Sequence, residues 1–435
     1  MLPVNPGGHA AYQNFVATNL RKYYPNPDAF SPATWDIIER FWNLDLSYTD
    51  DLLRSKYSVF GPKPRTPSCM QRSYLLSIDF KIHSLTDWAA QLKINPLYAI
   101  LSGFEFGDTP GVGTFYDFLS RLWDSEDSNL SSHLRPAKEK RIKKPTQKGA
   151  KAESVEKVSV DQLLGQLEAA SFVLDDQPYS SLFKIYHREF LSQSITKGLI
   201  DPSVLSLAGD GTPVVTSARE RKHPASKHDS LGFLETWFRM KAFLPDLHVS
   251  KWLLDSAHDA MPYYIYCRKN HIQPFIDLNV KRGIKVKYKN DFTIGEDGVP
   301  VCKAGRKMRH DGSEPSKGRL KFRCPLASRK YGCSCTHPCS DSKYGRTVHL
   351  AMKDNPRLIN FPPRDTKEWE KEFNARTSAE RSNKREKIGF QLESGRHRST
   401  KMWYCRLYHI MMLQHLDAWD LPFESPLRKL ILEVA

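Results

Sequence analysis

Two aspartates stand where they could bind a catalytic metal ion. Residues 204–209 and 251–254 are short, largely apolar runs that end at Asp210 and Asp255. Such runs are typical of buried strands, so each acid is expected near the C-terminal end of a strand. Two carboxylates that leave neighbouring strands can hold the paired Mg²⁺ ions that drive phosphodiester chemistry. A single aspartate after a strand more often caps the next helix, so a third acid is needed.

The third acid is expected on a helix from 367 to about 387, which Asp365 or Thr366 would cap. Spacings of three, four and seven residues place four side chains on one face of this helix: Phe373, Arg376, Glu380 and Lys387. A face that carries one ring, two cations and one acid is unusual. Taken alone, an exposed salt-bridge ladder from Arg376 to Glu380 explains the pattern as well.

These residues resemble the signature of prokaryotic insertion-sequence transposases of the DDE class. Apart from its first residue, the pattern Phe373-x2-Arg376-x3-Glu380-x6-Lys387 matches the Y-x2-R-x3-E-x6-K motif of that group. The segments around Asp210 and Asp255 resemble the two catalytic aspartate segments, and a further acid, Asp259, follows the second one as it does in the family. The resemblance covers about residues 204–419. More weakly, residues 84–123 resemble the helical segment that commonly precedes the catalytic domain.

The resemblance implies an RNase H-like catalytic domain in which Asp210, Asp255 and Glu380 hold two Mg²⁺ or Mn²⁺ ions. It implies metal-dependent cleavage of double-stranded DNA at transposon ends and strand transfer into target DNA, by a homodimer or higher multimer. Arg376 and Lys387 would contact DNA phosphates. Phe373, the third expected DNA contact, keeps the ring of the family tyrosine but lacks its hydroxyl, which puts any phosphate contact through that hydroxyl in doubt.

The charge of the chain also favours a nucleic-acid partner. The 435 residues include 65 Lys and Arg against 49 Asp and Glu, a net charge of +16. A polyanion is therefore expected as partner, DNA before an anionic membrane. With no secretory signal pattern and no apolar run long enough to span a bilayer, the sequence predicts a cytoplasmic, nucleoid-associated protein of a prokaryotic cell. Serine hydrolases and P-loop motors are disfavoured because their Gly-rich motifs do not occur.

Shifts in composition along the chain predict several domains. The predicted elements indicate a multidomain protein of the α plus α/β class. Residues 1–134 are expected to form a helical, helix-turn-helix-like DNA-binding region, in which Ser84, Asn95 and Thr114 cap short helices. Many small helical domains bind no nucleic acid, so the pattern leaves both alternatives open. Residues 135–158 carry nine basic and three acidic side chains and predict a flexible basic linker. Simple solvation of this segment and contact with phosphates explain its charge equally well.

Residues 159–435 are expected to form the RNase H-like mixed-sheet catalytic domain, which a basic β-rich insertion at about 281–361 interrupts. Between 281 and 346, 17 Lys and Arg stand against six Asp and Glu, and alternating residues predict strands at 284–288 and 320–324. A β-strand insertion of this kind is found in the same transposase subgroup. It would lie along DNA, where Tyr331 or Tyr344 could stack on a displaced base.

Four cysteines of the insertion could hold a structural Zn²⁺ ion: Cys324, Cys333, Cys335 and Cys339. A zinc ion held by four thiolates would stabilise a region that has few apolar side chains to form a core. The spacing is not two Cys-x2-Cys pairs, so free thiols in a reduced protein remain the alternative. For His258 and Asp259, which lie close to Asp255, a surface or helix-capping role is expected.

Two functions therefore follow from the sequence. The first is a DDE transposase with metal-dependent endonuclease and strand-transfer activity, which the presence of all three acids favours. The alternative is a catalytically inactive DNA-binding protein derived from a transposase, which would keep the basic surfaces without needing the three carboxylates.

Overall fold

The structure is a computed structural model of the whole chain. The residues that it describes are 8–26, 30–58, 60–125, 159–169, 177–210, 229–279, 292–295, 297–328, 330–336, 338–395, 397, 399–419 and 426–432. The predicted basic linker at 135–158 and the predicted strand at 284–288 lie outside the described residues.

The first part of the chain is helical, as the sequence predicts, and short caps delimit its helices. Within its described residues, the α-helices are α1 (Gly8–Tyr23), α2 (Pro32–Trp42), α3 (Ser47–Leu53), α4 (Pro67–Asp79), α5 (Leu85–Ile94), α6 (Pro96–Ser102) and α7 (Val112–Arg121). The Ser84 side chain accepts a hydrogen bond from the Asp87 amide, and Asn95 accepts one from the Leu97 amide, which confirms two predicted helix starts. The prediction for Thr114 is wrong. The extended residue Gly111 precedes the first turn of α7, so Thr114 already lies inside the helix.

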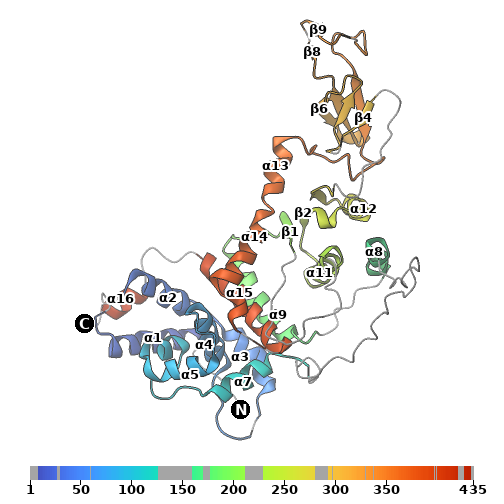
Figure 1. Cartoon of the computed structure of the whole chain (residues 1–435). Coiled ribbons are helices and arrows are strands. Elements are labelled where there is room, and N and C mark those ends of the chain that lie inside the picture. The colour runs from blue at the N-terminus through green and yellow to red at the C-terminus, as the bar shows by residue number, and fades with distance from the viewer. Residues whose placement is uncertain are drawn as a thin grey trace, which may run out of the picture.

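The core of this helical part is shared with helices from the middle and from the C-terminal end of the chain. They are α9 (Ser180–Ile185), α10 (Ser192–Thr196), α15 (Thr400–Ala418) and α16 (Pro426–Leu432), with a π-helical segment at Tyr186–Leu191. In Figure 1, α15 and α16 lie among the N-terminal helices. Met412 of α15 is fully buried in the same hydrophobic cluster as Leu75 of α4, and Arg40 of α2 forms an ion pair with Asp417. The predicted division at 134 and 159 therefore does not coincide with a division between hydrophobic cores.

The carboxyl group of Glu189 is buried in this core, where the π-helical segment at Tyr186–Leu191 packs against α3. Glu189 accepts hydrogen bonds from the amide and the hydroxyl of Thr49, each at 2.8 Å. Because burial disfavours its charged form, the pKa of Glu189 is raised from 4.5 to about 8. Between pH 4.5 and about 8, Glu189 is therefore protonated in the folded protein and ionised in the unfolded chain. The free energy of unfolding is therefore expected to fall as the pH rises between these two values.

Glu189→Gln is expected to remove about 3–4 kcal/mol of this fall between pH 5 and pH 8, because the neutral amide has no proton to lose and each unit of pKa shift corresponds to about 1.4 kcal/mol. Urea unfolding of the wild type and the variant at pH 5, 6.5 and 8 measures the effect. An equal pH dependence in the two proteins would contradict a raised pKa for Glu189.

The middle of the chain forms a parallel sheet with helices packed on it. Its described strands, β1 (Leu205–Gly209), β2 (Val249–Leu254) and β3 (Gln273–Ile276), pair in the order β1-β2-β3 and run parallel. The sequence predicts a mixed sheet, and residues 211–228, which follow β1, lie outside the described residues. The helices are α8 (Val160–Ala169), α11 (Asp229–Phe243) and α12 (Met261–Lys269). Trp252 of β2 is fully buried and stacks on Tyr266 of α12, with Trp237 of α11 against its edge. The fold thus combines a helical part with a helix-packed parallel sheet.

The segment predicted as an insertion is rich in β-strands and stands apart from the sheet, beyond α13 (Figure 1). It contains β4 (Phe292–Ile294), β5 (Pro300–Cys302), β6 (Arg309–Glu314), β7 (Arg319–Arg323), β8 (Ala327–Ser328), β9 (Gly332–Cys333) and β10 (Thr347–Ala351). All described strand pairs here are antiparallel, and β7 lies between β6 and β10. Phe322 of β7 and Leu350 of β10 are fully buried in its own small core. The strand predicted at 320–324 is confirmed as β7.

The chain returns from the insertion through α13 (Lys367–Asn374) and α14 (Thr377–Lys384), followed by a π-helical segment at Arg385–Gly389. Thr366 caps α13 by accepting a hydrogen bond from the Trp369 amide. One continuous helix from 367 to 387 is predicted, but the α-helix is interrupted between α13 and α14 at Ala375 and Arg376. In the part of the chain that the structure describes, no helix combines the length and apolar character needed to cross a membrane.

Candidate active site at the sheet edge

Asp210 and Asp255 lie at the same edge of the parallel sheet. Asp210 directly follows β1 and Asp255 directly follows β2, and the last residues of the two strands, Gly209 and Leu254, are register partners. Because parallel strands end at one edge, the two acids leave neighbouring strands in the same direction. The structure thus confirms that each acid stands at a strand end and that the two strands are adjacent.

The helix that carries the third acid contacts Asp210. Asn383 of α14 donates a hydrogen bond through Nδ2 to Oδ2 of Asp210 at 2.9 Å. Glu380 lies three residues before Asn383 on the same helix, so the two side chains stand on one face. Asn383 therefore brings the Glu380 face of α14 to the end of β1, a contact that the sequence analysis did not identify.

Each of the three acids has a partner within the chain. Asp255 caps the following 3₁₀ turn by accepting a hydrogen bond from the Ala257 amide, and its Oδ1 lies 2.7 Å from Nδ1 of the buried His258. Glu380, with half of its side chain exposed, pairs with Nη2 of Arg376 at 2.6 Å. The ladder from Arg376 to Glu380 that the sequence allowed is therefore present. The capping alternative for Asp255 is also confirmed.

The other residues of the predicted face contribute mainly to packing and charge balance. The Phe373 ring stacks on Trp369, with 4.6 Å between centroids, and Trp369 packs on Phe275 of β3. Phe373 therefore helps to anchor α13 on the sheet. Arg376 is largely buried, and within the described residues its Nε has no hydrogen-bond acceptor. Nζ of Lys387 lies 3.6 Å from Glu393.

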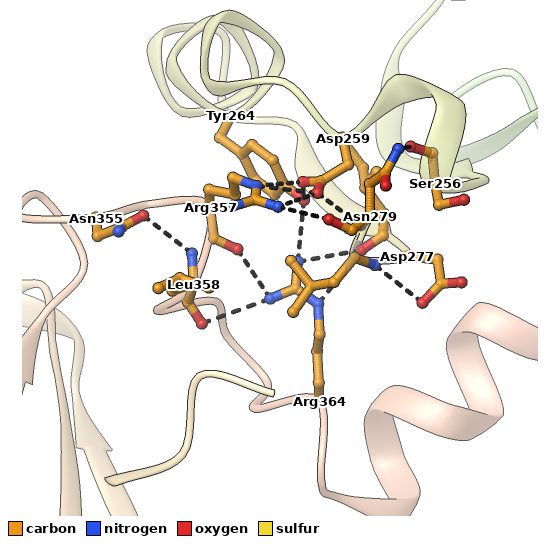
Figure 2. Close-up of polar contacts among 11 residues, drawn as sticks. Ser256, Asp259, Tyr264, Asp277, Asn279, Asn355, Arg357, Leu358 and Arg364 are labelled. Atoms are coloured by element: carbon orange, nitrogen blue, oxygen red, sulfur yellow. Dashed lines mark hydrogen bonds and ion pairs between the residues drawn. The ribbon is translucent and has the colours of Figure 1, made fainter. Parts of the chain in front are cut away.

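A buried ion pair next to Asp255 is the feature that the sequence analysis missed. Asp259, with no exposed side-chain surface, accepts hydrogen bonds from Nε of Arg357 at 2.8 and 2.9 Å and forms an ion pair with its Nη2. The Tyr264 hydroxyl and the Asn279 amide donate to the same carboxylate at 3.0 and 2.7 Å (Figure 2). The predicted surface or capping role is therefore wrong for Asp259, and it is wrong for His258 as well, which is buried and ends the 3₁₀ turn that Asp255 caps. Its partner lies 98 residues away, which no local pattern reveals.

A second arginine extends this network to the main chain. Arg364 donates through Nη1 to the Arg357 carbonyl oxygen at 2.9 Å, and through Nη2 to the Tyr264 hydroxyl and the Ile276 carbonyl (Figure 2). Ile276 is the last residue of β3, and Arg357 and Arg364 follow the last strand of the insertion. The network thus fixes the point where the insertion rejoins the sheet, beside the turn that carries Asp255.

The donor set at this edge fits hard divalent cations. Carboxylate oxygens are the protein ligands that Mg²⁺ and Mn²⁺ prefer, and three of them come from two strand ends and one helix that is hydrogen-bonded to the first strand end. Across the described ranges, no group of three or more His, Cys, Asp or Glu side chains converges closely enough to hold a metal ion. To bind here, a metal ion would have to displace the present partners of these acids, which are Asn383, His258 and Arg376.

The four cysteines of the insertion lie around β8 and β9. Cys324 directly follows β7 and is buried, Cys333 belongs to β9, and Cys335 and Cys339 follow it in half-buried positions. Burial raises the pKa of the Cys324 thiol, as do the neighbouring thiols of Cys333 and Cys339. Three of the four predicted ligands are therefore neighbours, while zinc binding stays a prediction.

If the four cysteines bind zinc, protein purified without chelators should contain about one zinc ion per chain, since four thiolates complete a tetrahedral site. Atomic absorption measures the metal, and Cys333→Ser is expected to remove it because one ligand is lost. Cys267→Ser alters a buried thiol of α12, outside the insertion, and should leave the zinc content unchanged. Zinc-free protein in which all eight thiols react when unfolded would contradict the site.

Comparison with known proteins identified no relative of this chain. Scanned against models of protein families, the chain matches none, and searches of curated proteins and of solved structures likewise found no match.

Proposed function

We propose that the protein is a DNA transposase that cleaves DNA and transfers strands with the help of divalent metal ions. The observation that carries the proposal is the placement of Asp210 and Asp255 at adjacent parallel strand ends, with the Glu380 helix held against Asp210 by Asn383. Asp210, Asp255 and Glu380 would hold Mg²⁺ or Mn²⁺. When bound, the metal ions would activate a nucleophile and stabilise the leaving oxygen of a phosphodiester.

The chain's own residues supply DNA contacts around this edge. Arg376 and Lys387 add positive charge on the helical face that carries Glu380 and on the following turn, which suits the phosphates of DNA. In the insertion, the Tyr331 ring is 79% exposed and lies 5.1 Å from the Lys330 ammonium group. An exposed ring beside a cation is suited to stack on an unpaired base next to a phosphate. These groups support DNA as the partner, and double-stranded element ends with a locally unpaired base as the proposed substrate.

The alternative is a DNA-binding protein without catalytic activity. One observation favours it: each of the three acids already has a protein partner, and Asp255 acts as a helix cap. Such a protein would keep the basic surfaces and the helical part, while its acids would serve only the fold.

Cleavage of the DNA that flanks the gene separates the two functions. End-labelled flanking DNA is incubated with the protein in Mg²⁺, Mn²⁺ or EDTA, and products are resolved on a denaturing gel, with a supercoiled plasmid as target for strand transfer. Metal-dependent cuts at defined flank positions support the transposase. Tight binding without cuts in either metal ion would support the binding protein instead.

A further inference from the structure

The helical part contains a cavity of about 370 Å³ that lies outside the proposed active site. The N-terminal residues of α1 line it together with the first turn of α4, and the side chains of Tyr12, Lys63 and Arg72 face it. Its volume is at the lower end of the range of small-molecule sites. The cavity is therefore large enough for a small ligand rather than for a single water molecule.

Arg72 is a buried cation with unused donors. Its side chain is 2% exposed, and its Cζ lies 3.5 Å from the centroid of the Tyr12 ring. Nη2 donates to the Leu44 carbonyl oxygen at 3.1 Å, whereas Nε and Nη1 have no acceptor among the described residues. A buried charge with two unused donors is costly, so an anion or other acceptor is expected beside it.

The nearby carboxyl groups, Glu189 among them, interact with the charge of Arg72 but accept no hydrogen bond from its Nε or Nη1. Asp50 uses both oxygens to accept hydrogen bonds from the amide and the hydroxyl of Ser68, at 2.7 and 2.8 Å. Asp45 accepts from the amide and the hydroxyl of Ser47 at 2.9 and 2.6 Å. Burial also raises the pKa of Asp50. These acids accept from amides at the starts of α3 and α4, and within the described residues Nε and Nη1 of Arg72 are left without an acceptor.

Further donors surround the same cavity. Nδ1 of His9 is buried without a partner in the described part of the chain, and Lys63 lines the cavity with an exposed side chain. The positive end of α1, a helix of 16 residues, lies there too. These donors outnumber the two oxygens of a carboxylate and are better matched by the three free oxygens of a phosphate.

We propose that this cavity binds a small phosphorylated ligand whose phosphate is held by Arg72. The phosphate could come from free inorganic phosphate or from a mononucleotide, for which Tyr12 and Phe15 offer apolar walls. The inference does not rest on the proposed DNA chemistry, because Arg72 belongs to the helical core and the three acids stand at the sheet edge.

Calorimetric titration of the full chain with inorganic phosphate, deoxyadenosine monophosphate and deoxyadenosine tests the proposal. Saturable binding of the two phosphorylated compounds is expected, and Arg72→Gln should weaken it by about tenfold or more because a charge-assisted contact is lost. Tighter binding of the nucleotide than of phosphate identifies a nucleotide site, and equal affinity identifies a phosphate site. No binding of either compound, or equal affinity in wild type and Arg72→Gln, would overturn the proposal.

Two control variants and one measurement on the wild type keep the result interpretable. Arg406→Gln alters another buried arginine, whose nitrogens donate to the carbonyl oxygens of residues 390–392, and should leave phosphate binding within about twofold. Asp210→Asn should also bind phosphate normally, which separates this site from the active site. If Arg72→Gln fails to fold, the wild type decides: phosphate should raise its Tm relative to chloride at equal ionic strength, and an unchanged Tm would overturn the proposal.

Discussion

Asp210→Asn, Asp255→Asn and Glu380→Gln are each expected to slow metal-dependent DNA cleavage by about a thousandfold or more, because a lost carboxylate ligand removes several kcal/mol of stabilisation from the transition state. Each change keeps the shape of the side chain and removes its charge, so folding should be preserved. DNA affinity, which in the proposed function comes from the basic surfaces, should remain within about threefold of the wild type. Single-turnover cleavage of the flanking DNA and filter binding measure the two quantities.

Glu370→Gln is the matched control for this series. Glu370 is an exposed acid on α13, on the same helical return from the insertion as Glu380, but it is not one of the three proposed metal ligands. Its loss should leave the cleavage rate within about twofold, since a surface charge far from the reacting phosphate contributes little. Equal loss of activity in Glu370→Gln, or unchanged activity in all three site variants, would contradict the assigned site.

Asn383→Ala tests how the site is positioned. Removing its amide breaks the hydrogen bond between α14 and Asp210 without removing any of the three acids. A smaller loss of cleavage than in Asp210→Asn is therefore expected, because all three carboxylates remain but α14 loses its contact with β1.

Arg357→Met is expected to lower the free energy of unfolding by about 3–5 kcal/mol, because it leaves the carboxylate of Asp259 buried without its ion-pair partner. The Tyr264 and Asn279 donors remain, but neither carries a charge. Urea unfolding followed by tryptophan fluorescence suits this measurement, since Trp237 and Trp252 are buried in the core of the neighbouring sheet.

Two further variants show whether the loss comes from the unpaired charge. Combining Asp259→Asn with Arg357→Met should restore most of the stability, because the neutral amide oxygen still accepts from Asn279 and no charge stays buried. Lys269→Met breaks an exposed pair with Glu168 and should cost less than about 1 kcal/mol. A double variant as unstable as Arg357→Met would show that packing, rather than the unpaired carboxylate, controls the loss.

Local patterns were enough to predict the elements that carry the candidate site. The apolar runs before Asp210 and Asp255 form adjacent strands, each followed by its acid. Such strands can be predicted because the signals that define them, apolar residues followed by polar ones, lie within a few positions of each other. The caps at Ser84, Asn95 and Thr366 were readable for the same reason. Thr114 was misassigned because Gly111, without a side chain to cap, can also begin a helix.

The sequence by itself thus determined the charge of the chain, the strand ends with their acids and the helical state of Glu380, but not the interruption at Ala375 and Arg376 that separates α14 from α13. The tertiary structure decided which groups meet. It brought Asn383 to Asp210, Arg357 to Asp259 and the C-terminal α15 into the N-terminal core. These pairings join residues that are 98 or more positions apart. Burial and charge pairing across such distances depend on how whole elements pack, and a pattern of neighbouring residues carries no information about that.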